Sequence, residues 1–147
     1  CFASRQESVA LDWTPLRDDE LFAILPPDYD NGGQEVFPVA DFAGREFLMP
    51  SMGFNLDIMR VLNRHGVLPL IRTTQVSDSV IISMVEHGLG VSMLSRLVLQ
   101  GRQDDVQALP LAPRAVRELG IASRPRKELR PAVRRFIAEA REMIEKM

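Results

Sequence analysis

The sequence predicts an α/β fold with a largely parallel sheet that helices cover on both sides. Strand-like and helix-like segments alternate along the chain, and the connections between them are short. Such repeats place parallel strands side by side, because each crossover helix returns over the sheet. The chain is 46% hydrophobic and 26% charged, which is ordinary for a globular protein, and its 147 residues suffice for about one domain.

Two strands are expected near the start of the chain. Residues 7–16 alternate partly between apolar and polar side chains, which predicts a half-buried strand. A charged turn is expected at Arg17–Glu20. Leu21–Leu25 are continuously apolar, so this second strand is predicted to be buried on both faces and to end at Pro26 and Pro27.

The middle of the chain predicts a helical turn and then a helix between two strands. The helical turn spans 38–43, with a proline at its start and a glycine after its end. Residues 45–50 predict a short buried strand, and 51–66 predict an amphipathic helix that a glycine closes. Residues 69–76 predict the next strand.

The stretch that begins at Ser77 predicts an abrupt change from helix to strand. Ser77 can cap a helix through its hydroxyl, and Asp78 suits the positive first turn. Gly88 accepts the left-handed conformation at the helix end, and an apolar strand follows at 90–94. The apolar face predicted for the helix consists of Val80, Ile81, Met84 and Val85.

The strand–helix–strand–helix–strand order of this region predicts how its strands pair. We expect 46–50, 70–75 and 90–94 to be parallel neighbours in one mixed sheet. Antiparallel pairing of the first and third of these strands would contradict the prediction.

The end of the chain predicts two strands and a long helix. Residues 106–111 predict a short edge strand, 116–125 an apolar-centred strand, and 130–147 an amphipathic helix that starts on a proline. The residues that recur at helical spacing are Val133, Phe136, Ile137, Ala140, Ile144 and Met147.

Charge and cysteine content exclude several classes of protein. The formal net charge of −2 gives the whole chain no basic field for nucleic acid, and the basic residues between Arg124 and Arg135 are interpreted as a solvated helix face and loop. One cysteine excludes a disulfide framework or a cysteine-rich metal site within the chain. No apolar run approaches the ~20 residues of a membrane span. The opening after Cys1 looks like the interior of a structured module, so we expect a fragment of a longer protein.

The sequence contains no motif for catalysis. The glycines at 88–90 precede a strand and lack a third glycine, which argues against a dinucleotide site. His65 and His87 each adjoin a helix-ending glycine, where helix capping is the favoured role. We expect no catalytic residue, no metal site and no cofactor. The carboxylates interpreted as solvated or capping groups are Asp57, Asp78 and Glu86.

Two predicted strand ends suggest a binding site instead. Ligands collect at the carboxyl ends of strands in open α/β sheets, against helix N-termini. Ser51–Gly53 follow the strand at 45–50, and Gln75–Asp78 follow the next strand. Each serine alone could simply cap its helix. The recurrence of the feature at two neighbouring strand ends favours binding.

The chain resembles the effector-binding domain of LysR-type transcriptional regulators over nearly its whole length. The family pattern "LVxxGxGIxxLP" matches Met84–Ser95, although Ser95 stands where the family usually has proline. Arg130 stands where a serine or threonine often caps the last helix. The segments that carry the resemblance, in order, are "LRDDELFAILPPDYD", "VADFAGREFLMPS", "VSDSVIISMVEHGLGVSMLS", "VQALPLAPRAVRELGIASRP" and "ELRPAVRRFIAEAREMI".

The resemblance implies a periplasmic-binding-protein type II-like fold, in which two crossing strands join two α/β lobes. The matching crossing strands are Leu21–Leu25 and Arg117–Ala122. Residues 26–118 would form one complete α/β/α second lobe, and residues 1–25 and 119–147 the C-terminal remainder of the first. The winged helix-turn-helix that binds DNA in the family, and the first half of the first lobe, are not in this sequence.

The resemblance also implies a non-enzymatic, ligand-sensing regulatory domain. We expect a small-molecule effector, with a carboxylate favoured, bound between the lobes of a cytoplasmic homodimer or homotetramer that reaches DNA only through the missing domain. The alternative is a solute-binding protein or a prephenate dehydratase-like enzyme module of the same fold. The expected effector-binding residues are Ser51, Met52, Gly53, Phe54, Val76, Ser77 and Asp78. The expected dimer-interface residues are Ser79, Ile82, Ser83 and Glu86.

Overall fold

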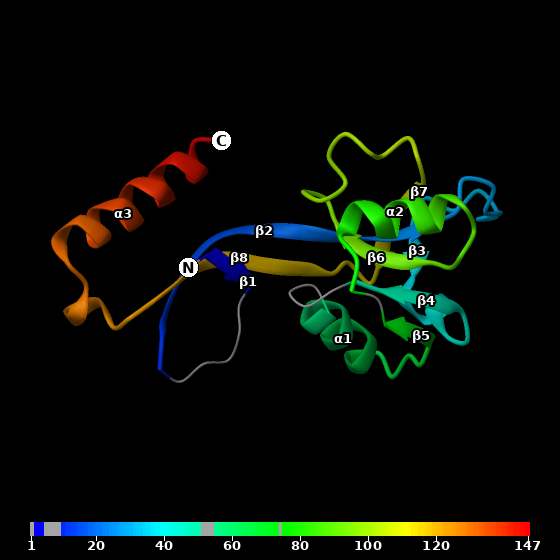
Figure 1. Cartoon of the computed structure of the whole chain (residues 1–147), viewed down its shortest axis with the longest axis horizontal. Helices are drawn as coiled ribbons and strands as arrows, with labels where there is room; N and C mark the ends of the chain where they lie inside the picture. Colours follow the sequence, from blue (N-terminus) through cyan, green and yellow to red (C-terminus); the bar gives the residue numbers. More distant parts are fainter. Residues whose placement is uncertain (1, 5–9, 51–54, 74) are drawn as a thin grey trace. The chain divides into compact units, whose positions relative to one another are not determined.

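The structure is a computed structural model of the chain, and it describes residues 2–4, 10–50, 55–73 and 75–147 (Figure 1). The predicted site residues at 51–54 lie outside these ranges. Within the described part of the chain, no helix is long and apolar enough to cross a membrane.

The chain divides into two compact units. Unit 1 comprises Cys1–Asp19 and Arg117–Met147, and unit 2 comprises Glu20–Val116. Two strands continue from one unit into the other: β2 (Asp12–Leu25) and β8 (Val116–Ser123). The strands expected from the family resemblance fall within β2 and β8. The assignment of these units to the two lobes stays a prediction.

Unit 2 holds most of the regular structure. Its sheet forms around the end of β2, which pairs antiparallel with β6 on one side and with β7 on the other. β3 is parallel to β7, and η1 confirms the predicted helical turn. The elements of this unit after β2 are β3 (Phe37–Pro38), the 3₁₀ helix η1 (Val39–Phe42), β4 (Glu46–Met49), α1 (Asn55–Arg64), β5 (Leu70–Thr73), α2 (Asp78–Glu86), β6 (Ser92–Ser95) and β7 (Gln107–Ala112).

The predicted parallel neighbours are confirmed, but the prediction of a largely parallel sheet is wrong, because β2 pairs antiparallel with both β6 and β7. β4 and β5 run parallel, with Glu46 opposite Leu70. On the other side of β4, Phe47 forms a parallel bridge with Val91, and the Leu48 N–H donates to the Val91 carbonyl at 2.8 Å. Residue 91 then leads into β6, whose antiparallel pairing with β2 makes the arrangement mixed.

Helices cover both faces of this sheet, as the sequence predicts. Side chains alternate between faces along a strand, so adjacent residues of β4 enter different cores. Phe47 and Met49 pack in one buried cluster with Ile58 of α1. Leu48 packs in a second buried cluster with Ile81 of α2. α1 and α2 therefore bury their apolar faces on opposite sides of one strand.

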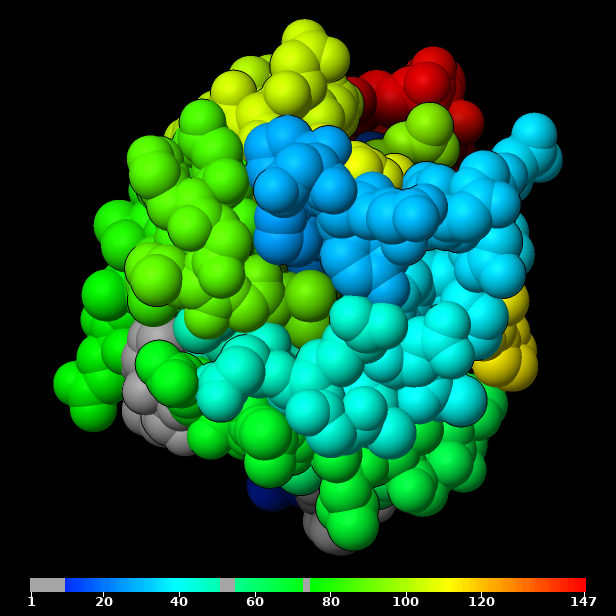
Figure 2. Space-filling model, turned by 90° about the vertical axis from the view of Figure 1, so that its right-hand side faces the viewer, coloured from blue at the N-terminus to red at the C-terminus, as the bar shows by residue number. Residues whose placement is uncertain are grey.

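The loop after β2 closes one end of the first core. Figure 2 shows the loop after β2 (blue to light blue) beside the segment around η1 (cyan). Tyr29 lies 6.4 Å from Phe37 between ring centroids, and the Arg45 guanidinium lies 5.1 Å from the Tyr29 ring. A cation over an aromatic face is attracted by the ring quadrupole, so this contact helps to hold the loop.

Two predictions about strands are wrong. Arg17–Glu20 do not form a turn, because β2 continues through them. The chain stays extended there because Asp19 pairs with Arg117 of β8. The strand near 106–111 is not an edge strand, since β7 lies between β2 and β3.

Unit 1 has a much smaller buried interior. β1 (Phe2–Ser4) pairs antiparallel with β8, which neighbours β2. After β8 come the 3₁₀ helix η2 (Arg126–Glu128) and α3 (Pro131–Glu145), which starts on proline as predicted. α3 buries none of its residues, and the Phe136 side chain is 55% exposed.

Candidate functional site

The carboxyl ends of β4 and β5 lie level at one edge of the unit 2 sheet. The parallel register pairs Met49 with Thr73, the last residues of the two strands. The chain continues from β4 toward α1 and from β5 toward α2. Both helices therefore begin from the same edge, which is where open α/β sheets present free N–H groups to ligands.

The structure describes three of the seven predicted effector-binding residues. Val76 is half-buried and packs against the α2 core cluster. Ser77 is exposed at the position before α2, and Asp78 is the half-buried first residue of that helix. Val76 and Ser77 lie in the connection between β5 and α2, and Asp78 lies at the start of α2.

Ser77 does not cap α2 through its side chain, so that prediction is wrong. Its main-chain carbonyl accepts hydrogen bonds from the N–H groups of Val80 (3.0 Å) and Ile81 (3.1 Å). Its hydroxyl makes no cap bond and instead lies 2.9 Å from the Ser79 hydroxyl. The first-turn N–H groups of α2 are thus not occupied by this side chain.

Asp57 is a buried carboxylate in the first turn of α1, so of the two roles that the sequence suggested, solvated or capping, the solvated one is wrong. Its side chain is 4% exposed. Oδ1 accepts a hydrogen bond from Arg60 Nη1 at 3.2 Å, and Oδ2 has no partner among the described residues. Helical spacing could have revealed this burial, because position 57 is one turn from Val61 and adjacent to Ile58. A negative charge here counts against an anion at the start of α1.

α2 is rotated about its axis relative to the prediction, so that different residues face outward. Ile82 is 1% exposed, so its predicted exposure at an interface is wrong. Val80, predicted to be in the apolar face, is 42% exposed. Burial of Ile81, Ile82 and Val85 against the sheet turns the helix this way. We define the outer face of α2 by the residues on its other side: Ser79, Val80, Ser83, Glu86 and His87.

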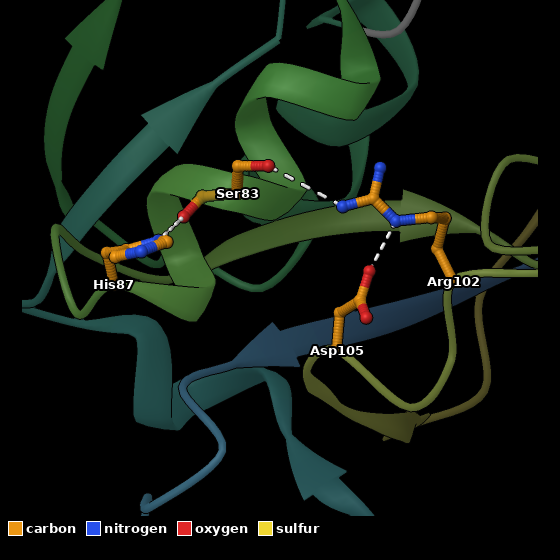
Figure 3. A network of polar contacts seen from close by, with 4 residues as sticks. All are labelled: Ser83, His87, Arg102 and Asp105. Atoms are coloured by element: carbon orange, nitrogen blue, oxygen red, sulfur yellow. Dashed lines mark hydrogen bonds and ion pairs between the residues drawn. The ribbon is translucent and has the colours of Figure 1, made fainter.

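A polar network ties this outer face to the loop after β6 (Figure 3). His87 Nδ1 lies 2.8 Å from the Ser83 carbonyl oxygen, which agrees with helix capping. Arg102 Nη2 lies 3.5 Å from the Ser83 hydroxyl, and Arg102 Nε also pairs with Asp105. The loop thereby adds a fixed guanidinium beside α2, which helical periodicity alone could not indicate.

The described ranges contain no group of three or more His, Cys, Asp or Glu side chains that could hold a metal ion. The arrangement offers hydroxyls, main-chain N–H groups and half-buried apolar side chains at a sheet edge. Those groups can recognise a small molecule by hydrogen bonding and apolar contact.

A family model described as "LysR substrate binding domain" matches residues 2–145. The chain belongs to this LysR substrate-binding domain family. The match extends across both units, so it includes the predicted effector site, the outer face of α2 and α3.

Among curated sequences, this LysR domain is similar to YnfL of Escherichia coli (strain K12), which is described as an uncharacterized HTH-type transcriptional regulator. The two are 28% identical over 133 residues, which are 86% of this chain and 44% of YnfL. The chain thus spans less than half the length of the curated relative that it matches.

Solved structures show the same fold. The regulatory domain of CcmR from Synechocystis PCC6803, in complex with 2-PG, is 22% identical and matches with a TM-score of 0.83. That match covers 99% of this chain and 73% of CcmR. The effector-binding domain of QuiR in complex with shikimate is 19% identical, also with a TM-score of 0.83, and the match covers 99% and 71% of the two chains.

Proposed function

We propose that this LysR domain is the ligand-sensing part of a transcriptional regulator and that it has no catalytic role. The observation that carries the proposal is the family match over residues 2–145. A small-molecule effector binds, and the domain transmits its presence to a DNA-binding domain elsewhere in the regulator. The solved complexes of the CcmR regulatory domain with 2-PG and of the QuiR effector-binding domain with shikimate support a small molecule as the ligand class.

We place the effector at the carboxyl ends of β4 and β5. The predicted contact residues are Ser51–Phe54 and Val76–Asp78. Support comes from the level ends of the two parallel strands and from the Ser77 hydroxyl, which does not cap α2. A carboxylate would meet the positive first turns of two helices. The carboxylates of Asp57 and Asp78 would repel a negatively charged ligand, so the experiment must compare a charged ligand with a neutral one.

The test is a thermal-shift screen of the intact regulator with small carboxylates and their neutral amides. A true effector raises the melting temperature by mass action, because it binds the folded state. Ser51→Trp should abolish the shift by filling the site. Gln34→Trp is the matched control, because Gln34 is exposed and lies after β2. β2 runs antiparallel to β6, so its end lies at the opposite sheet edge from the proposed site.

The outcome separates two parts of the proposal. An effector whose affinity is unchanged by Ser51→Trp would contradict the location of the site. A preference for the amide over the acid would contradict the carboxylate class and leave the location intact.

We further propose that the outer face of α2 meets another subunit of the regulator. The face combines small side chains at Ser79 and Ser83 with the half-exposed Val80, which lets a partner helix approach closely. The network through Arg102 keeps the neighbouring loop in place beside it. Signal transmission would then follow from a rearrangement of subunits.

Sedimentation of the intact regulator tests this interface. Val80→Arg places a charge on the outer face, and we expect the dimer to dissociate at concentrations at least about tenfold higher than for the wild type. Gln34→Arg is the control for added charge. An equally tight dimer in the Val80→Arg variant would mean that the subunits meet elsewhere. Ile82→Arg is unsuitable here, because it would bury an unpaired charge in the core.

The sequence also left open a solute-binding protein or a prephenate dehydratase-like enzyme. Similarity to the HTH-type regulator YnfL favours the regulator. A basic helix-turn-helix upstream of this chain would support it further, and an export signal there would contradict it.

A further inference from the structure

A cavity of about 350 Å³ lies within unit 1, separate from the proposed effector site in unit 2. The start of β2, the end of β8, the segment around η2 and one face of α3 form its walls. Its volume is near the lower end of the ~300–1,000 Å³ that ligand pockets span, so it suits a small molecule.

One face of α3 supplies both apolar and cationic groups to this cavity. Arg134, Ile137, Ala138 and Arg141 all line it, and their spacing of three and four residues places them on one side of the helix. Phe136, which is largely exposed, is not among the lining residues. The cavity therefore uses a different side of α3 from the Phe136 ring.

The opposite wall is aromatic. Trp13 of β2 lines the cavity, and its indole N–H donates to Glu118 Oε1 at 2.5 Å. This bond fixes the ring, and a fixed indole gives a flat apolar surface on which a ligand can pack. Leu129 adds a second apolar contact near η2.

Three guanidinium groups give the cavity an excess of positive charge. Neither Arg126 nor Arg134 forms an ion pair with any described residue, and Arg141 lies 3.5 Å from the exposed Glu145 carboxylate. The single lining carboxylate, Asp12, accepts the main-chain N–H of Arg126 at 2.8 Å through Oδ2. That carboxylate is therefore already engaged, whereas two of the arginine side chains are not.

We propose that this cavity binds a small organic anion. The carboxylate or phosphate of the ligand would lie between Arg134 and Arg141, since a guanidinium pairs with such groups through two parallel N–H donors. Its apolar body would pack against Trp13 and Ile137. The site is independent of the effector site in unit 2, so either can fail in experiments without the other.

Trp13 makes the proposal directly measurable, because it is the single tryptophan of the chain. We would titrate the protein with phenylacetate and with phenylacetamide, which have the same ring and differ in charge, and follow tryptophan emission. The expected result is a saturable change with phenylacetate and a response at least about tenfold weaker with the amide.

Two arginines on α3 provide a matched pair of variants. Arg134→Gln should weaken phenylacetate binding about tenfold or more, because it removes a charge-assisted contact. Arg135→Gln should leave binding unchanged, since Arg135 pairs with Glu139 at 2.8 Å and does not line the cavity. Both variants remove one positive charge from the same helix, so nonspecific charge effects cancel.

Three results would overturn the proposal. Equal responses to the acid and the amide would mean a merely apolar surface. Equal weakening by the two arginine variants would mean diffuse electrostatic attraction without a defined site. Trp13 emission that changes with protein concentration and not with phenylacetate would mean that a second copy of the chain covers the cavity.

Discussion

Each of the two units of this chain is stabilised by a different kind of interaction. Unit 2 folds around two buried apolar clusters on opposite faces of one strand, β4. In unit 1, Ile121 is the one buried apolar side chain among the residues whose burial is described, and the long helix α3 buries none. Unit 1 relies on contacts between its strands, such as Asp19 with Arg117 and Trp13 with Glu118.

The difference teaches where each unit is sensitive to substitution. A packed core loses stability when a buried side chain is truncated, because cavity formation adds to the lost burial. A unit with little core depends on a few polar and close-packing contacts between strands. Three pairs of variants test this contrast. In the first two pairs, one variant should lower the free energy of unfolding much more than the other. In the third pair, the two variants should act in different units.

The largest effect should come from truncating a core phenylalanine. Phe47→Ala removes a fully buried ring from β4, and we expect the free energy of unfolding to fall by about 3–5 kcal/mol. Phe136→Ala removes an equal ring that is 55% exposed on α3, and should cost within about 0.5 kcal/mol. Urea unfolding followed by circular dichroism measures both. Equal losses would mean that α3 is covered in solution and that unit 1 has a core of its own.

The second pair compares one ion pair from each unit, Asp19–Arg117 of unit 1 and Glu20–Arg114 of unit 2. Asp19–Arg117 is buried, with 1% and 11% of the side chains exposed, whereas Glu20–Arg114 leaves Arg114 67% exposed. Asp19→Ala removes the carboxylate that pairs with the buried Arg117 guanidinium, and it should lower the free energy of unfolding by about 3 kcal/mol. Glu20→Ala should cost at most about 1 kcal/mol, because solvent screens the exposed pair.

Trp13 emission during urea unfolding reports this loss in unit 1. The double variant Asp19→Ala with Arg117→Ala serves as the control. It should recover part of the stability, because no charge is left without a partner. A double variant less stable than Asp19→Ala alone would show that Arg117 stabilises the strands through other contacts.

Much of unit 2 could be predicted from sequence because local patterns decide it. The continuous apolar run Leu21–Leu25 predicted a doubly buried strand, and its residues do divide between the two core clusters. The β–α–β order predicted the parallel pairing of β4 with β5 and with Val91. These features depend on periodicity and short connections, which the sequence contains directly.

The errors arose where distant residues decide the outcome. The polar run Arg17–Glu20 has turn composition, yet it is extended because Asp19 pairs with a residue 98 positions away. Positions 80–82 of α2 are all β-branched and apolar, so periodicity could not decide whether Val80 or Ile82 is buried. Packing against β4 and β6 decides it. The effector residues at 51–54 stay a prediction.

The third pair tests close approach of the backbone in each unit. A Cβ added at Gly120 of β8 would lie 2.4 Å from the Thr14 carbonyl oxygen and 2.6 Å from Cζ2 of Trp13. One added at Gly90 would lie 2.7 Å from the Glu46 carbonyl oxygen. These distances are shorter than carbon contacts allow, so the neighbouring group must move. We expect either alanine variant to cost about 1–3 kcal/mol, as overpacking usually does.

The two glycine variants should nevertheless differ in which unit reports the change. Gly120→Ala should displace the indole and alter Trp13 emission in the native state, before any urea is added. Gly90→Ala acts at the bridge between Val91 and β4 and should leave native emission unchanged while it lowers the unfolding midpoint. If Gly120→Ala left the emission unaltered, the strands of unit 1 would have to separate enough to admit a methyl group. Close packing between β2 and β8 would then contribute less to the stability of unit 1 than we infer from the small number of buried residues there.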